Sequence, residues 1–487
     1  MFHTPTPVMQ WAFIIMLLVS AGTCVLIIAA FFRRWQQIRY SRYNHSLQSK
    51  YRPILANVLA GTRTPSDLEA LRVLPLPELE LLLDPLFFKR KLPERCLAFL
   101  RALCQELGLI DLWQSRLTLG DTEEPQPPAK VTTPDTAGHP PITYLSRVKS
   151  IRNLGELRHQ PSWPFLVEAL DDRYPEVQFV ALRALAALGA PESFPALRDR
   201  LHEVAEGEST SPSLQGLKAA MAGFDLTCVL DLLPSLRHPN RQIRMHAIEI
   251  LRTMVRREAG RRPGLTLTPK LLTPPMVELL LSRLAVDTSS EIRARAAEVI
   301  VFLSGPRVTR VLHNLLLDHQ WFVRLHTLQA LNNKGEAAAP LYLDIRDCLC
   351  DLHWRVREAA IQTLLSLGQG GRHQLYEHFL TFPDHSTRAQ VVEVIERTGL
   401  ISALVQHYSA GGNGLDARMV EELAGDSALL GLSGVLRTAS PEVRHRFMLR
   451  FVPSWQSRMP LPVEMGLSVL TADKPPQLID SPRFMAA

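Results

Sequence analysis

The chain has 487 residues, more than one ordinary domain holds, so either several domains or an extended repeat array is expected. Its hydrophobic fraction of 46% is typical of a folded protein, and no stretch alternates with a period of two, which predicts an almost entirely helical fold. Six of the 54 basic residues lie between positions 33 and 52, and the other 48 equal the 48 acidic residues, so the sequence disfavours a long nucleic-acid-binding face, which needs a distributed basic surface.

The first notable segment is an uncharged apolar stretch over residues 8–32, preceded by a short N-terminal tail, residues 1–7. At about 1.5 Å rise per residue, a helix of this length crosses a hydrocarbon core of roughly 30 Å. A cleaved signal peptide would carry Lys or Arg in its first residues and an apolar core of only about 7–15 residues, and this segment has neither feature. We therefore expect a retained, single-pass transmembrane helix.

Basic residues follow the apolar stretch at once and are absent before it. The positive-inside rule then predicts an N-terminus outside and the rest of the chain in the cytoplasm, at the cell (plasma or inner) membrane. The juxtamembrane segment 33–52 alternates basic and aromatic residues, so it either contacts anionic headgroups or serves only as a stop-transfer flank. The flanking basic residues are Arg33, Arg34, Arg39 and Arg42.

Two segments of different character come next. Residues 53–119 are predicted to form short helices between prolines, either as a small helical region or as a degenerate beginning of a repeat array. Residues 120–141 contain six prolines and almost nothing apolar. This composition predicts a semi-extended linker that lets the following region reorient.

The following region repeats one helical pattern, which is clearest at residues 290–305. There Ile292, Ala296, Val299, Ile300 and Leu303 form one apolar stripe on a helix of period 3.6, and a single helix cannot bury this stripe alone. Like Arg293, which has Asp287 six residues before it, the copies at 324 and 357 keep an Arg in second place and an Asp six residues earlier. At the Arg position the copies stand at 178, 215, 244, 293, 324, 357, 388, 418 and 444. A period near 31 to 33 residues predicts an array of supersecondary units.

At these residues the chain resembles the HEAT-repeat α-solenoids, in the form of a bacterial-type membrane-anchored HEAT-repeat protein. In that family each repeat is a pair of antiparallel helices, and an Asp and an Arg six residues apart form a ladder along the stack. The resemblance, over residues 142–455, implies an all-α solenoid and a general role in binding, without a catalytic residue. The ladder residues it identifies are Arg244, Asp287, Arg293, Asp318, Arg324, Asp351 and Arg357.

Two parts of the array are candidate functional features. The row of Arg residues either binds phosphate or joins neighbouring repeats through the Asp residues, and the regular offset favours the structural role, because paired guanidinium donors are already satisfied. The long step between positions 244 and 293 predicts an inserted basic loop, residues 255–275, that either binds an acidic partner or lipid headgroups or is merely solvated. Its candidate binding residues are Arg256, Arg257, Arg261 and Arg262.

No residues in the sequence have a recognisable catalytic or metal-binding spacing. His373 and His378 match no zinc-protease pattern, and Cys348 and Cys350 are expected on different sides of a helix. We therefore expect no catalytic site, no metal and no cofactor. Residues 456–487 lack periodicity and are predicted to form a partly disordered tail.

The favoured hypothesis is a membrane-anchored, non-catalytic scaffold whose cytoplasmic solenoid binds protein partners, such as a membrane enzyme complex. The anchor itself would contact membrane lipids. One alternative is binding of anionic lipid or nucleic acid through the basic segments 33–52 and 256–270. A second alternative is an enzyme with its site in the solenoid groove.

Overall fold

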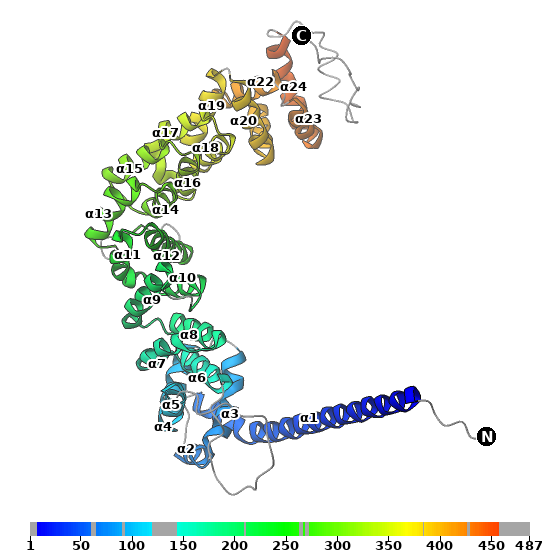
Figure 1. Ribbon diagram of the computed structural model, residues 1–487. Helices are drawn as coiled ribbons and strands as arrows, with labels where there is room; N and C mark the ends of the chain where they lie inside the picture. The colour runs from blue at the N-terminus through cyan, green and yellow to red at the C-terminus, as the bar shows by residue number, and fades with distance from the viewer. Residues whose placement is uncertain are drawn as a thin grey trace, which may run out of the picture. The chain divides into compact units, whose positions relative to one another are not determined.

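The computed structural model describes residues 7–59, 65–89, 93–118, 144–208, 211–262, 266–267, 272–382, 384–425 and 429–456. Every regular element within these ranges is an α-helix or a short 3-10 helix (Figure 1). The all-α prediction is therefore confirmed for the described part of the chain. Contacts between Cα atoms divide the chain into two units, Met1–Phe224 and Asp225–Ala487.

Unit 1 begins with one long helix, α1 (Pro7–Leu59), which includes the predicted membrane span 8–32 and the predicted juxtamembrane segment 33–52. It also passes the boundary expected at residue 53, and Pro53 lies inside it. Among the residues that the structure describes, no helix combines the length and the apolarity needed to cross a membrane. Most side chains of residues 8–21, in the first half of the predicted span, lie outside the described part of the structure.

Short helices follow α1, as the prolines predict. They are α2 (Pro65–Arg72), α3 (Leu76–Lys89), α4 (Glu94–Glu106) and α5 (Leu109–Thr118). Trp113 of α5 is fully buried, and its indole N–H donates to Glu80 of α3 at 2.8 Å. The same carboxylate accepts from Arg116 at 2.9 Å, so both charges of this pair are satisfied inside the small helical region.

The remaining α-helices of unit 1 are α6 (Tyr144–Leu157), α7 (Trp163–Glu168), α8 (Pro175–Leu188), α9 (Phe194–Glu206) and α10 (Leu214–Met221), with 3-10 turns at Gln160–Ser162, Ala169–Asp171 and Pro191–Ser193. Each helix packs against others of the unit. At Gly155 a Cβ atom would lie 2.7 Å from the Cβ of Ala184, so the close approach of α6 and α8 requires glycine there.

The predicted linker, residues 120–141, lies outside the described residues. The helices on either side of it pack together, which differs from the separate bodies that the sequence predicts. Asp84 of α3 pairs with Lys149 at 2.8 Å and with Arg152 at 3.2 Å, both on α6. The apolar side of α5 is buried against α6 and α7, which explains why residues 65–118 join the first repeats.

Unit 2 consists of helix pairs. Its described α-helices are α11 (Leu233–Arg237), α12 (Arg241–Arg261), α13 (Pro274–Ser282), α14 (Ser290–Ile300), α15 (Pro306–Leu316), α16 (Trp321–Asn332), α17 (Tyr342–Asp347), α18 (Trp354–Ser366), α19 (Gly368–Thr381), α20 (His385–Arg397), α21 (Leu400–Ser409), α22 (Leu415–Gly425), α23 (Leu429–Thr438) and α24 (Pro441–Gln456). The 3-10 helices are Leu226–Leu232, Leu284–Val286, Gly335–Leu341 and Cys348–Cys350.

The pairs form two layers. Helices α12, α14, α16, α18 and α20 follow one another in the layer that we call the second-helix layer, while α13, α15, α17 and α19 form the first-helix layer (Figure 1). The stripe residues Ile292, Ala296, Val299 and Ile300 are fully buried between them, as their spacing predicts. Thr327, which replaces the small Ala of this stripe in α16, donates its buried hydroxyl to the Val323 carbonyl at 2.8 Å.

The structure differs from the sequence prediction at the inserted basic loop, 255–275. Helix α12 continues through Arg261, so the first seven residues of that segment are helical. Met254 and Val255 are fully buried and extend the apolar stripe, which stabilises these additional turns of helix. Residues 263–265 and 268–271 of the predicted loop lie outside the described residues, as do residues 457–487 of the predicted tail.

Candidate functional site

Arginine side chains join consecutive helices of the second-helix layer into a ladder. Arg293 of α14 donates from Nε and Nη2 to the two carboxylate oxygens of Asp318, at 2.6 and 2.9 Å. Its Nη1 donates to the backbone carbonyl of Asp287, at 2.8 Å. Arg293 therefore binds the carboxylate of the following repeat, and Asp287, six residues before it, gives Arg293 only a backbone oxygen.

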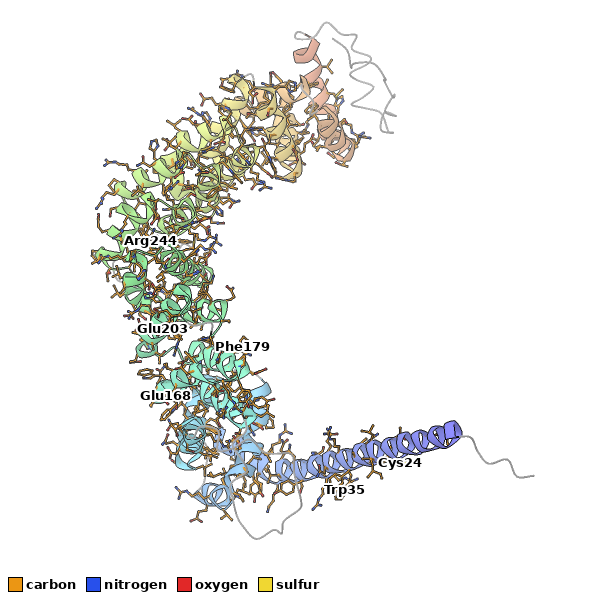
Figure 2. The ribbon with its side chains drawn as sticks, in the orientation of Figure 1. Cys24, Trp35, Glu168, Phe179, Glu203 and Arg244 are labelled. Carbon is orange, nitrogen blue, oxygen red and sulfur yellow. The ribbon has the colours of Figure 1, made fainter. Side chains whose placement is uncertain are left out.

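The same geometry recurs in neighbouring repeats. Arg244, labelled in Figure 2, binds Asp287 at 2.9 and 3.1 Å. Arg324 binds Asp351 at 2.6 and 2.9 Å. Arg357 departs from this pattern, because its Nε and Nη2 donate at 3.0 Å to the neutral acceptors Gln390 Oε1 and Ser386 Oγ.

The sequence analysis did not identify one rung, in unit 1. Arg147 of α6 binds Asp172, with Nε at 2.8 Å and Nη2 at 3.3 Å. Arg147 stands one repeat period before Gln178, and that spacing is the signal that would have revealed it. Gln178 takes the place of Arg in the next repeat and donates to the backbone carbonyl of Asp172 at 2.6 Å.

The rungs have no spare charge for a ligand. The side chains of Arg293 and Asp318 are each 8% exposed. Burial raises the pKa of Asp318, but the hydrogen bonds from Arg293 and from the Gln320 backbone N–H outweigh it and hold that pKa below 3.8. The hydrogen bond to Asp318 raises the pKa of Arg293. Because these guanidinium donors are satisfied inside the protein, the geometry supports a structural role and not phosphate binding.

A second set of ion pairs crosses the same helices in the opposite sense. Arg295 of α14 donates to Glu249 of α12 at 3.1 Å, and His326 Nδ1 of α16 lies 3.1 Å from Glu298 of α14. In these pairs the basic side chain belongs to the later helix, whereas in the ladder the carboxylate does. The two sets together oppose sliding of neighbouring repeats in either direction.

Glu298 is the most buried carboxylate of this second set, with 3% of its side chain exposed. It pairs with Arg252 at 3.2 Å and with Arg256, both from α12. Burial raises the pKa of Glu298, yet the hydrogen bond with His326 and the charges of Arg252 and Arg256 hold it below 4.5. Arg256, predicted to lie in a binding loop, is therefore engaged with the repeats themselves.

The other predicted basic residues lie in different surroundings. Arg261 and Arg262 pair with Glu258 at 3.7 and 2.9 Å. Burial and the charge of Arg261 lower the pKa of Arg257. The four membrane-flank residues, Arg33, Arg34, Arg39 and Arg42, are exposed on α1.

The second-helix layer is hollowed between α18 and α20. A cavity of about 590 Å³ lies there, and its wall includes Trp354, Glu358, Glu393 and Arg397. The Trp354 side chain is 52% exposed, and its backbone carbonyl accepts from Gln390 at 2.7 Å. Arg397 pairs with Glu358 at 2.6 Å. An exposed indole beside carboxylates is suited to a peptide segment that carries both apolar and basic side chains.

The described Cys and His side chains near α19 do not have the geometry of a catalytic or metal site. Within the described ranges, no three or more His, Cys, Asp or Glu side chains are grouped to hold a metal ion. Cys350 Sγ lies 3.8 Å from His378 Nε2, but burial and the charge of Asp347 raise the pKa of this thiol. Burial raises the pKa of Cys348 to about 12 and lowers that of His378. A protonated thiol is a weak nucleophile, so this pair is not an activated dyad.

Residues 144–217 match a family model described as HEAT repeats. This segment contains the Arg147–Asp172 rung and the helix pairs of unit 1. A search among curated proteins found no match to the chain. On the family match and the paired-helix architecture, the fold is an all-α HEAT-like solenoid.

Several solved structures match the chain at low identity. Kap121p bound to Pho4p is 12% identical over 86% of this chain and 47% of that chain, with a TM-score of 0.42. A structure of Kap95p with RanGDP is 12% identical over 84% of this chain and 58% of that chain, with a TM-score of 0.39. Human deoxyhypusine hydroxylase in complex with glycerol is 16% identical over 58% of this chain and 93% of that chain, with a TM-score of 0.23. The chain thus spans about half the length of the two Kap proteins, and TM-scores this low support no statement about function.

The ladder yields a first prediction. Replacing Arg293 with Met keeps the length of the side chain but leaves Asp318 buried without its cation, which should lower the free energy of unfolding by about 3 kcal/mol. Urea unfolding, with hydrogen exchange of the α14 and α16 amides, measures this. Arg307→Met is the matched control, because the Arg307–Glu278 pair is exposed and its loss should leave stability unchanged. Equal effects of the two substitutions would contradict a structural ladder.

Glu298 yields a pH prediction. Its folded-state pKa is depressed, so its stabilising contribution is present above pH 4.5 and disappears as the pH falls through the lower folded-state value. Glu298→Gln should therefore destabilise the protein near pH 7, by about 2 kcal/mol, and the difference from wild type should shrink as the pH falls through the depressed pKa of Glu298. Urea unfolding of wild type and variant at several pH values measures the destabilisation and its dependence on pH. A difference that stays constant with pH would show that the charge of Glu298 does not contribute.

Proposed function

We propose that the chain is a non-catalytic scaffold that binds a protein partner on the second-helix layer of unit 2. The observation that carries this proposal is the half-exposed indole of Trp354 at the cavity between α18 and α20. Trp is the residue type most often found at the energetic centre of protein interfaces, since it buries a large area with little loss of side-chain freedom. Binding requires no covalent chemistry.

The charges around Trp354 favour a particular kind of partner. Glu393 is exposed at the cavity wall, while Glu358 is already paired with Arg397. A partner segment with a basic side chain close to an apolar one would satisfy Glu393 and cover the indole. The hydrogen bonds of Arg357 to α20 and the Arg397–Glu358 pair hold α18 and α20 together beforehand, which lowers the entropy cost of binding.

This proposal is tested by affinity purification of the full chain from detergent-solubilised membranes. Trp354→Ala should reduce the recovery of the specifically bound protein at least about tenfold, because the central contact is lost. Leu343→Ala is the control, since it removes a comparably exposed apolar side chain from α17 in the first-helix layer. A partner retained equally by wild type and both variants would exclude this surface as its binding site.

We also propose that α1 anchors the scaffold in the cell membrane as a single-pass helix, with the N-terminus outside and the solenoid in the cytoplasm. Support comes from the uncharged stretch 8–32 and from a run of more than half-exposed apolar side chains on α1 at Val25, Leu26, Ile27, Ile28 and Phe31. Such a run is unfavourable in water and favourable in lipid. Cys24 and Trp35 lie on the same length of α1 (Figure 2).

The basic residues that follow this run support the same orientation. Arg33, Arg34 and Arg42 are exposed directly after it, where they would meet anionic headgroups on the cytoplasmic side. The guanidinium of Arg39 lies 5.4 Å from the centre of the Trp35 ring, an arrangement suited to the membrane–water interface. Tethering would then raise the local concentration of the scaffold near membrane-bound partners.

The anchor is tested by fractionation after a carbonate wash. The double variant Leu26→Lys and Ile28→Lys should move the protein from the membrane pellet to the supernatant, because two charges oppose insertion by about 5 kcal/mol or more. Val73→Lys is the matched control, since Val73 is an exposed apolar residue outside α1. If wild type is already in the supernatant, or if the double variant stays in the pellet, the anchor is excluded.

A further inference from the structure

Unit 2 contains another cavity, where α19 and α21 face each other and α22 begins. Its volume is about 440 Å³, within the range of small-molecule sites, which is roughly 300–1,000 Å³. Residues at i, i+3, i+4 and i+7 line it on both helices, beginning at Gln369 on α19 and at Leu400 on α21. Each helix thus presents one whole face to the cavity, and the first turn of α22 closes one side.

The strongest indication of a ligand is the phenol of Tyr376. This side chain lines the cavity and is only 2% exposed, yet its hydroxyl has no hydrogen-bond partner in the part of the chain that the structure describes. The hydroxyl is therefore free to donate to a ligand in the cavity. Burial and the charge of Asp416 raise the pKa of Tyr376, so the phenol keeps its proton and remains a donor.

The cavity also contains an arginine without an ion-pair partner among the described residues. Arg372 lines the wall one helical turn before Tyr376, and no described carboxylate lies within ion-pairing distance of it. Asp416, the acidic residue of the wall, is instead paired with His407, at 3.1 Å between Oδ2 and Nδ1. The cavity wall therefore holds two donors that have no protein acceptor within the ranges described, the Arg372 guanidinium and the Tyr376 hydroxyl, while its carboxylate, Asp416, is engaged by His407.

The turn that leads into α22 is held in place by contacts with α21 and α24. At Gly412 a Cβ atom would lie 2.4 Å from the His407 ring, so a larger residue there would displace this ring. Arg450 of α24 donates to Asn413 Oδ1 at 2.7 Å and to the Tyr408 carbonyl at 3.0 Å. These contacts fix the position of His407 and of the α22 N-terminus before any ligand arrives.

We propose that this cavity binds a small organic anion, whose carboxylate or phosphate group accepts from Arg372 and from the Tyr376 hydroxyl. The apolar body of the ligand would lie against Ala403 and Leu404 of α21, which form the opposite wall. Guanidinium groups suit both oxyanions, because their planar donors match two oxygens at once. The site is separate from the partner-binding surface, since it lies on α19 and α21 and not in the groove of Trp354.

The test is a ligand-observed NMR titration of the full chain in detergent, with phenyl phosphate and benzoate as probes. Both carry the same ring, so the tighter binder identifies the preferred oxyanion. Inorganic phosphate tests the oxyanion alone, and benzyl alcohol tests the ring alone. We expect saturable binding of one aromatic anion at millimolar concentration, and at least about tenfold weaker binding of benzyl alcohol.

Three variants assign the binding to this cavity. Arg372→Gln should weaken the preferred probe about tenfold or more, and Tyr376→Phe, which removes one oxygen from a buried ring, about three- to tenfold. Arg418→Gln removes the same charge from the exposed side of α22 and should leave affinity unchanged. Absence of saturable binding to wild type overturns the proposal, and so does equal binding by wild type and the folded Tyr376→Phe variant.

Discussion

The apolar stripe of each second helix can leave water only when the next repeat stacks upon it, and the rest of the structure depends on this constraint. Burial alone does not fix how two helices align, because it is not directional. The bidentate bond from Arg293 to Asp318 provides the direction, since its two parallel donors accept only one placement of the carboxylate. The opposing pair of His326 with Glu298 adds a second restraint of the opposite sense.

The same constraint separates the residues that hold the fold from those that remain free to bind. The arginines of the second-helix layer are spaced like a phosphate-binding row, but most of them donate their hydrogen bonds to the neighbouring repeat. The features left over are those that the stacking does not need, namely the Trp354 indole in one layer and the Arg372–Tyr376 cavity in the other. In the pair formed by α19 and α20, α20 lines the groove of Trp354 and α19 lines the cavity of Tyr376. The two proposed sites are therefore on different layers.

The sequence predicted the helical periodicity well, because burial of a stripe at i, i+4, i+7 and i+8 is a local property of one helix. It also identified Asp287, Arg293, Asp318 and Arg324 as a set, because they recur with the repeat period. It did not reveal that Arg147 belongs with them, since the next copy has Gln178 in place of Arg. Nor did it show that Arg256 is bound to Glu298, a residue more than forty positions away.

By itself, the sequence determined the class of fold, the repeat and most residues of the ladder, since periodicity and composition are sufficient for these. Only the tertiary structure decided that Arg244, Arg293 and Arg324 bind the carboxylate of the following repeat. It also decided that residues 255–261 extend α12 and that Tyr376 lies buried next to an unpaired Arg372. The physical reason is that hydrogen bonds and charges between repeats depend on how helices stack. The spacing of residues along the chain indicates which side chains could pair, but it does not determine the distances between them in the folded protein.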